Sequence, residues 1–106
     1  MRLNEYQNLA LATAAPLDDE TRLVVGALGL AGEAGEYADR IKKHIAQGHP
    51  LDADGLLGEL GDILWYIALA ADSIGHDMET VAQHNIDKLK ARYPEGFSTE
   101  RSLHRE

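Results

Sequence analysis

Two copies of one short acidic pattern, GEAGE and GELGD, are the residues of this chain best suited to chemistry. Each copy places two carboxylates three residues apart, so in a helix Glu33 would share a face with Glu36. By the same spacing, Glu59 would share a face with Asp62 on a second helix. Carboxylates gathered at one place repel and raise each other's pKa unless a cation lies among them. If the two helices face each other, the four acids predict a divalent metal site.

The spacing between the two copies predicts an antiparallel helical hairpin, in which facing residues have position numbers with a constant sum. The numbers of Glu33 and Asp62 add up to 95. Those of Glu36 and Glu59 give the same total. The chain would fold back beside Gly48-His49-Pro50, because glycine commonly ends a helix and proline often follows it. A solvated acidic face without a ligand is the alternative, but two copies in matching register favour the metal site.

Four helices are expected to build and support this hairpin, and no segment shows the alternation of a β-strand. Asp18 and Asp19 are expected to supply the cap of the second helix, and Asp77 that of the fourth. The expected helices span residues 3–15, about 20–47, from 52 or 54 to 74, and about 78–92. The sequence therefore predicts an all-α fold, a four-helix, bundle-like subunit with a central antiparallel hairpin.

Six glycines lie inside the two hairpin helices, and each costs about 1 kcal/mol relative to alanine at such a position. Close packing of the two helix backbones would offset this cost, and it would also bring the carboxylates within reach of shared ions. The glycines are Gly26, Gly29, Gly32, Gly35, Gly58 and Gly61.

Length and composition predict a single domain over residues 1–106. Within it, about residues 95–106 are expected to form a flexible or subunit-swapping tail. Phe97 could anchor this tail on a neighbouring subunit. One Trp, one Phe and four Tyr allow only a modest core. Trp65 is expected in that core or in a subunit interface. A homodimer or homotetramer would bury more apolar surface than one subunit can.

The charge and residue content argue against several classes of protein. A net charge of −8 is unsuited to nucleic acids or anionic membranes. The chain has no cysteine, which excludes disulfides and thiolate ligands. Its longest apolar run, residues 63–71, is far shorter than the roughly 20 residues of a membrane helix. We therefore expect a cytoplasmic protein.

The ligand set of the acidic cluster points to a hard cation. None of the five histidines follows an acid by three residues, so the Glu-x-x-His pair of di-iron bundles is absent. Carboxylate oxygens suit Mg²⁺, with Mn²⁺ as a second choice, and Mg²⁺ often completes its coordination with substrate phosphates. This favours a phosphate-bearing substrate and a metal-activated water that attacks phosphorus.

The chain carries an E-x-x-E motif within GLAGEAGEYADRIKK, then a spacer of 22 residues, then an E-x-x-D motif within GELGDILWYIA. Over about residues 28–97, this arrangement resembles the MazG-like all-α nucleotide pyrophosphohydrolases. The resemblance implies Mg²⁺-dependent hydrolysis of a nucleoside triphosphate to its monophosphate and pyrophosphate, in dimers or tetramers. It implies Glu33, Glu36, Glu59 and Asp62 as metal ligands. Either Glu36 or Glu59 would take the proton of the attacking water. Dimeric dUTPases and phosphoribosyl-ATP pyrophosphohydrolases look similar in this motif pair, so the resemblance does not determine the nucleotide base of the substrate.

Further residues could bind the substrate. Asn85, Lys88 and Arg92 share one face of the fourth helix, suitable for phosphate and sugar, and the resembling family places an Asn and a Lys there near the nucleotide. An ordinary solvated face is the alternative. Tyr66, four residues after Asp62, could stack on a base or pack between helices. Lys43 could reach the same anion or only balance the helix end.

Two other functions remain open at this level. The chain could be a nucleotide-binding or regulatory helical module with little catalysis. It could also be a structural helical bundle that associates through its glycines and binds no metal.

Overall fold

The computed structural model of the chain describes residues 1–104, and these contain helices and no strand. The predicted all-α fold is therefore confirmed. The four expected helices are present, and a short fifth one lies in the segment expected to be a tail. They are α1 (Leu3–Leu11), α2 (Asp19–Ala46), α3 (Ala53–Ser73), α4 (Met78–Arg92) and α5 (Thr99–Leu103).

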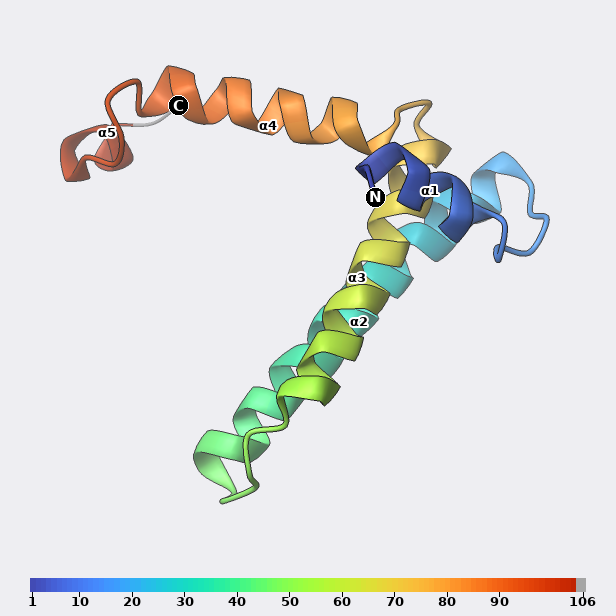
Figure 1. Cartoon of the computed structure of the whole chain (residues 1–106), viewed down its shortest axis with the longest axis horizontal. Helices are drawn as coiled ribbons and strands as arrows, with labels where there is room; N and C mark the ends of the chain where they lie inside the picture. Colours follow the sequence, from blue (N-terminus) through green and yellow to red (C-terminus); the bar gives the residue numbers. More distant parts are fainter. Residues whose placement is uncertain (105–106) are drawn as a thin grey trace.

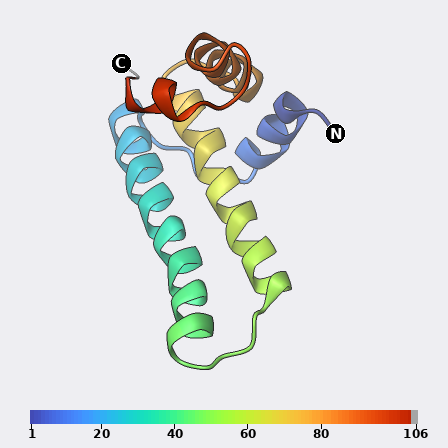
Figure 2. The same cartoon turned by 90° about the vertical axis from the view of Figure 1, so that its left-hand side faces the viewer.

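The two long helices α2 and α3 lie side by side and run in opposite directions, joined by a turn at the far end of the molecule (Figures 1 and 2). Aspartates start both helices: Asp18 accepts a hydrogen bond from the Thr21 backbone N–H at 2.7 Å, and Asp52 accepts one from Gly55 at 3.0 Å. Gly48 takes a positive φ of 72° just after α2 ends. The turn therefore lies where the sequence places it, because glycine tolerates this conformation.

Three pairs of residues that meet across the hairpin follow a constant-sum register. Their position numbers add up to values between 94 and 96, close to the 95 of the acidic pairs. The pairs are Arg22 with Asp72, Gly26 with Ala70, and Gly29 with Tyr66.

The six hairpin glycines do not all serve close packing, contrary to expectation. A Cβ added at Gly26 would lie 3.4 Å from the Ala70 Cα, and one added at Gly29 would lie 2.0 Å from the Tyr66 ring. At the other four positions an added Cβ would meet nothing within 4 Å in the described part of the chain. These open positions are Gly32, Gly35, Gly58 and Gly61. Close contact between α2 and α3 therefore explains two of the six glycines.

The first helix is shorter than the expected span of residues 3–15, and at its end the carbonyls accept from donors other than the N–H groups four residues later. The Ala10 carbonyl accepts hydrogen bonds from the Thr13 hydroxyl at 2.6 Å and from Trp65 Nε1 at 3.2 Å. Side-chain donors of this kind compete with continuation of a helix. Trp65 thus fastens α1 to α3 and packs against the core, which agrees with one of its two expected roles.

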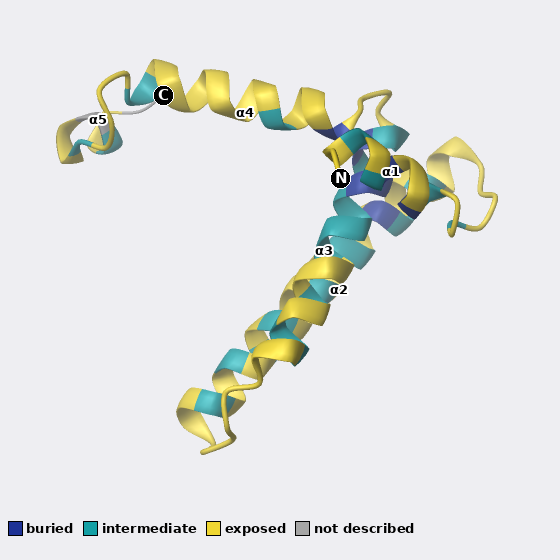
Figure 3. Ribbon diagram, viewed as in Figure 1, coloured by how far each residue is buried: buried dark blue, intermediate teal, exposed yellow. Residues whose placement is uncertain are grey.

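The core lies at the end of the hairpin where α1, α3 and the start of α4 meet (Figure 3). Gln7 is 4% exposed and joins these elements. Its amide nitrogen donates to the carbonyls of Ala68 at 3.2 Å and His76 at 3.3 Å, and its oxygen accepts from the Met78 N–H at 3.1 Å. Every polar atom of this buried side chain is therefore paired, as burial requires.

The fourth helix begins beside α1 and then extends away from the hairpin (Figure 1). Asp77 caps it through the Thr80 N–H at 2.7 Å, as predicted. Asn4 and Glu79 each accept a hydrogen bond from the other's backbone, at 3.0 and 3.1 Å. Beyond this first turn, α4 lies apart from the middle of α2 and α3.

Many large apolar side chains are exposed along the hairpin, including Leu28 at 69%, Leu57 at 69% and Leu60 at 50%. Phe97, beyond α4, is also exposed, although its ring lies 5.7 Å from that of Tyr93. None of the helices in the described residues combines the length and the apolar character that crossing a membrane requires.

Candidate metal centre

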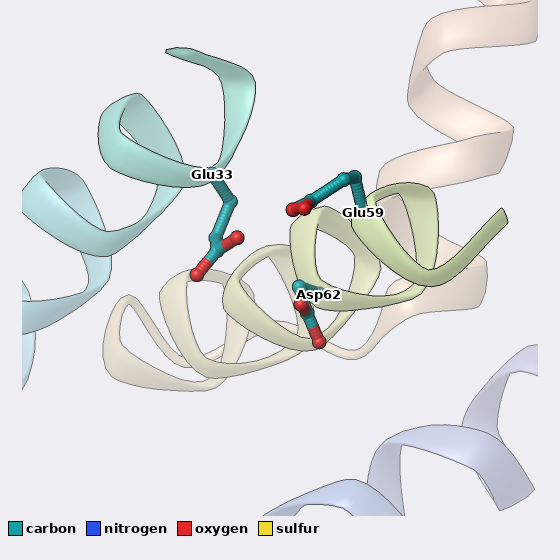
Figure 4. Close-up of side chains that lie close together, drawn as sticks. All are labelled: Glu33, Glu59 and Asp62. Atoms are coloured by element: carbon teal, nitrogen blue, oxygen red, sulfur yellow. The ribbon is translucent and has the colours of Figure 1, made fainter. Parts of the chain in front are cut away.

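Three acids from the two helices of the hairpin meet in one place. Glu33 of α2 points toward Glu59 and Asp62 of α3 (Figure 4). One carboxylate oxygen from each of the three residues can be chosen so that all lie within 4.8 Å of one another. Glu33 and Glu59 are partly buried, and Asp62 is exposed. The contact of Gly29 with Tyr66, one helical turn away, holds α2 and α3 close at this level.

The electrostatics of the cluster are those of carboxylates forced together. The pKa of Glu33 is raised above its ordinary value of 4.5, first by partial desolvation and then by its contact with the Glu59 carboxyl. The charges of Asp62, Glu59 and Glu36 raise it further. A cation placed among these oxygens would relieve this repulsion, because it favours the ionised form of each acid.

The donor set fits a hard divalent cation. Mg²⁺ binds oxygen ligands at about 2.0–2.1 Å, so opposite ligands stand about 4.2 Å apart. The chosen oxygens of the cluster lie within 4.8 Å of one another, so small rotations of these flexible side chains would bring them to that spacing. The exposure of Asp62 leaves one side of the site open to water and to phosphate oxygens. Glu33, Glu59 and Asp62 could thus hold Mg²⁺ or Mn²⁺.

Glu36, the fourth predicted ligand, is not part of this group among the described residues. Its side chain lines a neighbouring pocket of about 430 Å³ beside the hairpin turn. Glu59, the residue expected to face Glu36, forms an ion pair with Arg40 instead, with 3.0 Å between Nε and Oε1. The structure therefore brings together three of the four acids, and the fourth contributes negative charge from one turn away.

Arg40 is a further residue of this centre, and it lies outside both acidic motifs. Besides Glu59, its guanidinium contacts Asp52, with 3.4 Å between Nη1 and Oδ2. A signal for it was present in the sequence, because Arg40 follows Glu33 by seven residues and Glu36 by four, which places all three on one side of α2.

Tyr66 lies beside the cluster, in a position that suits both of its predicted roles. With Glu33, Asp62 and Trp65 it lines an open pocket of about 340 Å³. Its ring packs against Gly29 and stands at 81° to the ring of Trp65, with the centroids 5.0 Å apart. The packing role is thus observed, and the pocket leaves room for a ring of a substrate.

Lys43 lines the pocket beside the hairpin turn, together with Glu36 and Arg40. Its Nζ lies 2.9 Å from Asp39 Oδ2. Hydrogen bonds from Lys43 and Lys42 hold the pKa of Asp39 below its ordinary value of 3.8. Within the chain, Lys43 is therefore a charge-balancing partner that faces the same pocket as Glu36.

The three polar residues predicted on α4 are not gathered at the acidic cluster. Asn85 and Lys88 are exposed and Arg92 is partly buried. None of the three side chains forms a hydrogen bond or ion pair within residues 1–104. Because α4 extends away from the hairpin, a single subunit does not place these residues around the cluster.

Comparison with known proteins places this site in a family. The family model described as the MazG nucleotide pyrophosphohydrolase domain matches residues 26–97, a range that holds all four acids. The chain is also 34% identical over 105 residues to "Gene 37 protein" of Mycobacterium phage L5, across 91% of this chain and 92% of that protein. No solved structure matches. The chain therefore belongs to the MazG nucleotide pyrophosphohydrolase domain family.

Proposed function

We propose that this protein is a Mg²⁺-dependent pyrophosphohydrolase that converts a nucleoside or deoxynucleoside triphosphate into its monophosphate and pyrophosphate. One observation supports this proposal above the others. In a chain of the MazG family, Glu33 and the pair Glu59 and Asp62 come from two helices and offer oxygens within 4.8 Å of one another. A cytoplasmic location would suit this substrate.

The proposed reaction needs a cation, a water and a base. Bound Mg²⁺ or Mn²⁺ would supply positive charge for the phosphates and lower the pKa of the attacking water. Glu33, Glu59 and Asp62 would hold the ion, and Glu36 or Glu59 would accept the proton of the water. The water oxygen forms a bond to the α-phosphorus, the bond from that phosphorus to the bridging oxygen breaks, and pyrophosphate leaves.

The proposed substrate contacts come from three helices, α2, α3 and α4. Tyr66 would bind the base or sugar in the pocket beside Asp62, and Lys43 would contact the phosphates from the pocket beside the hairpin turn. Asn85, Lys88 and Arg92 lie on α4, which extends away from the cluster of its own chain. In our proposal they reach the nucleotide in a homodimer or homotetramer, from the α4 of a neighbouring subunit.

A second candidate function is favoured by the position of Glu36. Because this acid lies outside the group formed by Glu33, Glu59 and Asp62, the site could bind a nucleotide and a cation without an effective base. The protein would then be a nucleotide-binding or regulatory module with little turnover.

Measurements of pyrophosphate release separate these two candidate functions. The substrates to be tested are a panel of natural triphosphates, including dUTP and dCTP, and phosphoribosyl-ATP. We expect release with Mg²⁺ or Mn²⁺ and its loss in Glu59→Gln, while Asp54→Asn, an exposed acid of the same helix, remains active. Circular dichroism should show the same helical content in all three proteins. Nucleotide affinity without product would favour the binding module, and full activity of Glu59→Gln would contradict the proposed site.

A further inference from the structure

Arg40 links the metal centre to the start of α3. It lies on α2 and donates from Nε to Glu59 Oε1 at 3.0 Å and from Nη1 to Asp52 Oδ2 at 3.4 Å. We propose that Arg40 is a positioning residue, which holds the Glu59 carboxylate in the orientation that binds the cation. This inference rests on the proposed function, because it takes the cluster to be a metal site.

The surroundings of Glu59 show why its orientation needs a partner. Its side chain is only 12% exposed, one of its oxygens lies within 4.8 Å of oxygens of Glu33 and Asp62, and its Oε1 is 3.0 Å from Arg40 Nε. Repulsion alone would turn the carboxylate away from the other two acids. The Nε–H of Arg40 binds Oε1 of Glu59, and the second oxygen would then be left for a cation. Partners of this kind orient ligands in known metal sites.

The other contact of Arg40 is itself held in place. Asp52 uses Oδ1 to accept from the Gly55 N–H at 3.0 Å, which caps α3, and uses Oδ2 to face Arg40. The guanidinium therefore bridges a helix cap and a predicted ligand. A lysine would keep the charge but could not reproduce two donors in a fixed planar arrangement.

Gly55 gives an independent sign that the structure makes room for this guanidinium. A Cβ added there would lie 2.3 Å from Arg40 Nη1 and 2.5 Å from Asp52 Oδ2. At Gly58, one turn further along α3, an added Cβ would meet nothing within 4 Å. Gly55→Ala should therefore displace the guanidinium without changing any charge, and Gly58→Ala is the matched control.

Calorimetric titration with Mn²⁺ tests the inference. Loss of a hydrogen-bonding partner behind a metal ligand typically weakens binding 10- to 100-fold, so we expect Arg40→Lys and Gly55→Ala each to raise the Mn²⁺ Kd about tenfold. The double variant should bind Mn²⁺ no more weakly than either single variant, because each change removes the same contact between Arg40 and Glu59. Gly58→Ala should bind within about twofold of the unaltered protein.

The titration also separates this inference from the proposed function. If the unaltered protein binds Mn²⁺ and both Arg40→Lys and Gly55→Ala bind it equally well, Arg40 does not position Glu59, although the metal site stands. If the unaltered protein binds no Mn²⁺, the metal site and this inference both fail. A purely structural role would lower the metal-free melting temperature and leave the Mn²⁺ Kd unchanged, which would also overturn the inference.

Discussion

Among the single residues, Glu33 shows most directly what the acidic cluster does to the fold. Its pKa is raised by partial desolvation, by contact with Glu59 and by neighbouring charges. A carboxyl whose folded-state pKa is raised stabilises the fold while protonated, below its unfolded pKa, and loses that contribution as the pH rises through the folded value. Without a cation, the ionised Glu33 therefore opposes folding at neutral pH.

We predict that Glu33→Gln melts at a higher temperature than the unaltered protein when metal is chelated, and that this difference grows as the pH rises from about 4.5 toward 7. Asp18 and Asp77 have lowered pKa values, so their contributions change below 3.8, outside this window. Saturating Mg²⁺ should reverse the order, because only the unaltered protein keeps all three ligands. Thermal melts over this pH range measure the effect, and a difference independent of pH would contradict it.

At the scale of elements, the site depends on how closely α2 and α3 approach. Gly29 is the tightest of the six hairpin glycines, because its backbone lies against the Tyr66 ring beside the acidic cluster. The open glycines Gly32 and Gly35 have no such neighbour among the described residues. The same substitution should therefore have opposite effects at two positions of one helix.

We predict that Gly29→Ala lowers the free energy of unfolding. Displacing the Tyr66 ring should cost about 1–3 kcal/mol, more than the roughly 1 kcal/mol gained in helix propensity. Gly35→Ala should instead raise the free energy of unfolding by up to about 1 kcal/mol. Urea titrations of both variants measure this, and equal stabilisation by the two would show that the helices do not approach closely at Gly29.

A second prediction concerns the joint between α1, α3 and α4. Gln7→Leu removes the acceptor of the buried Met78 N–H, so it should lower the free energy of unfolding by about 1–3 kcal/mol. The control is Gln83→Leu, an exposed amide of α4, which should change it by no more than about 0.5 kcal/mol. Denaturant melts compare the two, and equal effects would mean that Gln7 does not hold this joint.

The elements that the sequence could predict are those with strong local signals. Capping aspartates and the glycine at Gly48 set the limits of α2 and the hairpin turn, and the spacing of the acids gave the register that brings Glu33 to Glu59 and Asp62. Two features depend on contacts between distant segments and could not be found this way. At the end of α1 the Ala10 carbonyl accepts from Trp65 of α3, and the separation of Glu36 accompanies the ion pair of Arg40 with Glu59.

At the scale of the whole molecule, one subunit buries little of its apolar surface. The buried core gathers at one end of the hairpin, while Leu28, Leu57 and Leu60 remain exposed along its length. Large exposed apolar areas commonly mark interfaces between proteins. Together with the direction of α4, this supports the proposed homodimer or homotetramer.

We predict that light scattering gives a mass two or four times the 11.6 kDa of one chain. Leu57→Glu should shift the mass toward the monomer, because it puts a charge at an exposed apolar position of the hairpin. Asn8→Glu adds the same charge at an exposed polar position of α1 and should leave the mass unchanged. A monomeric unaltered protein would contradict the proposed assembly.

In the proposed site, carboxylates from both helices of the hairpin share a divalent cation. Anomalous diffraction from a crystal soaked in Mn²⁺ would locate this cation. We expect a peak between α2 and α3, with oxygens of Glu33, Glu59 and Asp62 about 2.0–2.5 Å from it. A crystal in which Mn²⁺ binds elsewhere, or in which these three carboxylates turn away from a common point, would contradict the proposed site.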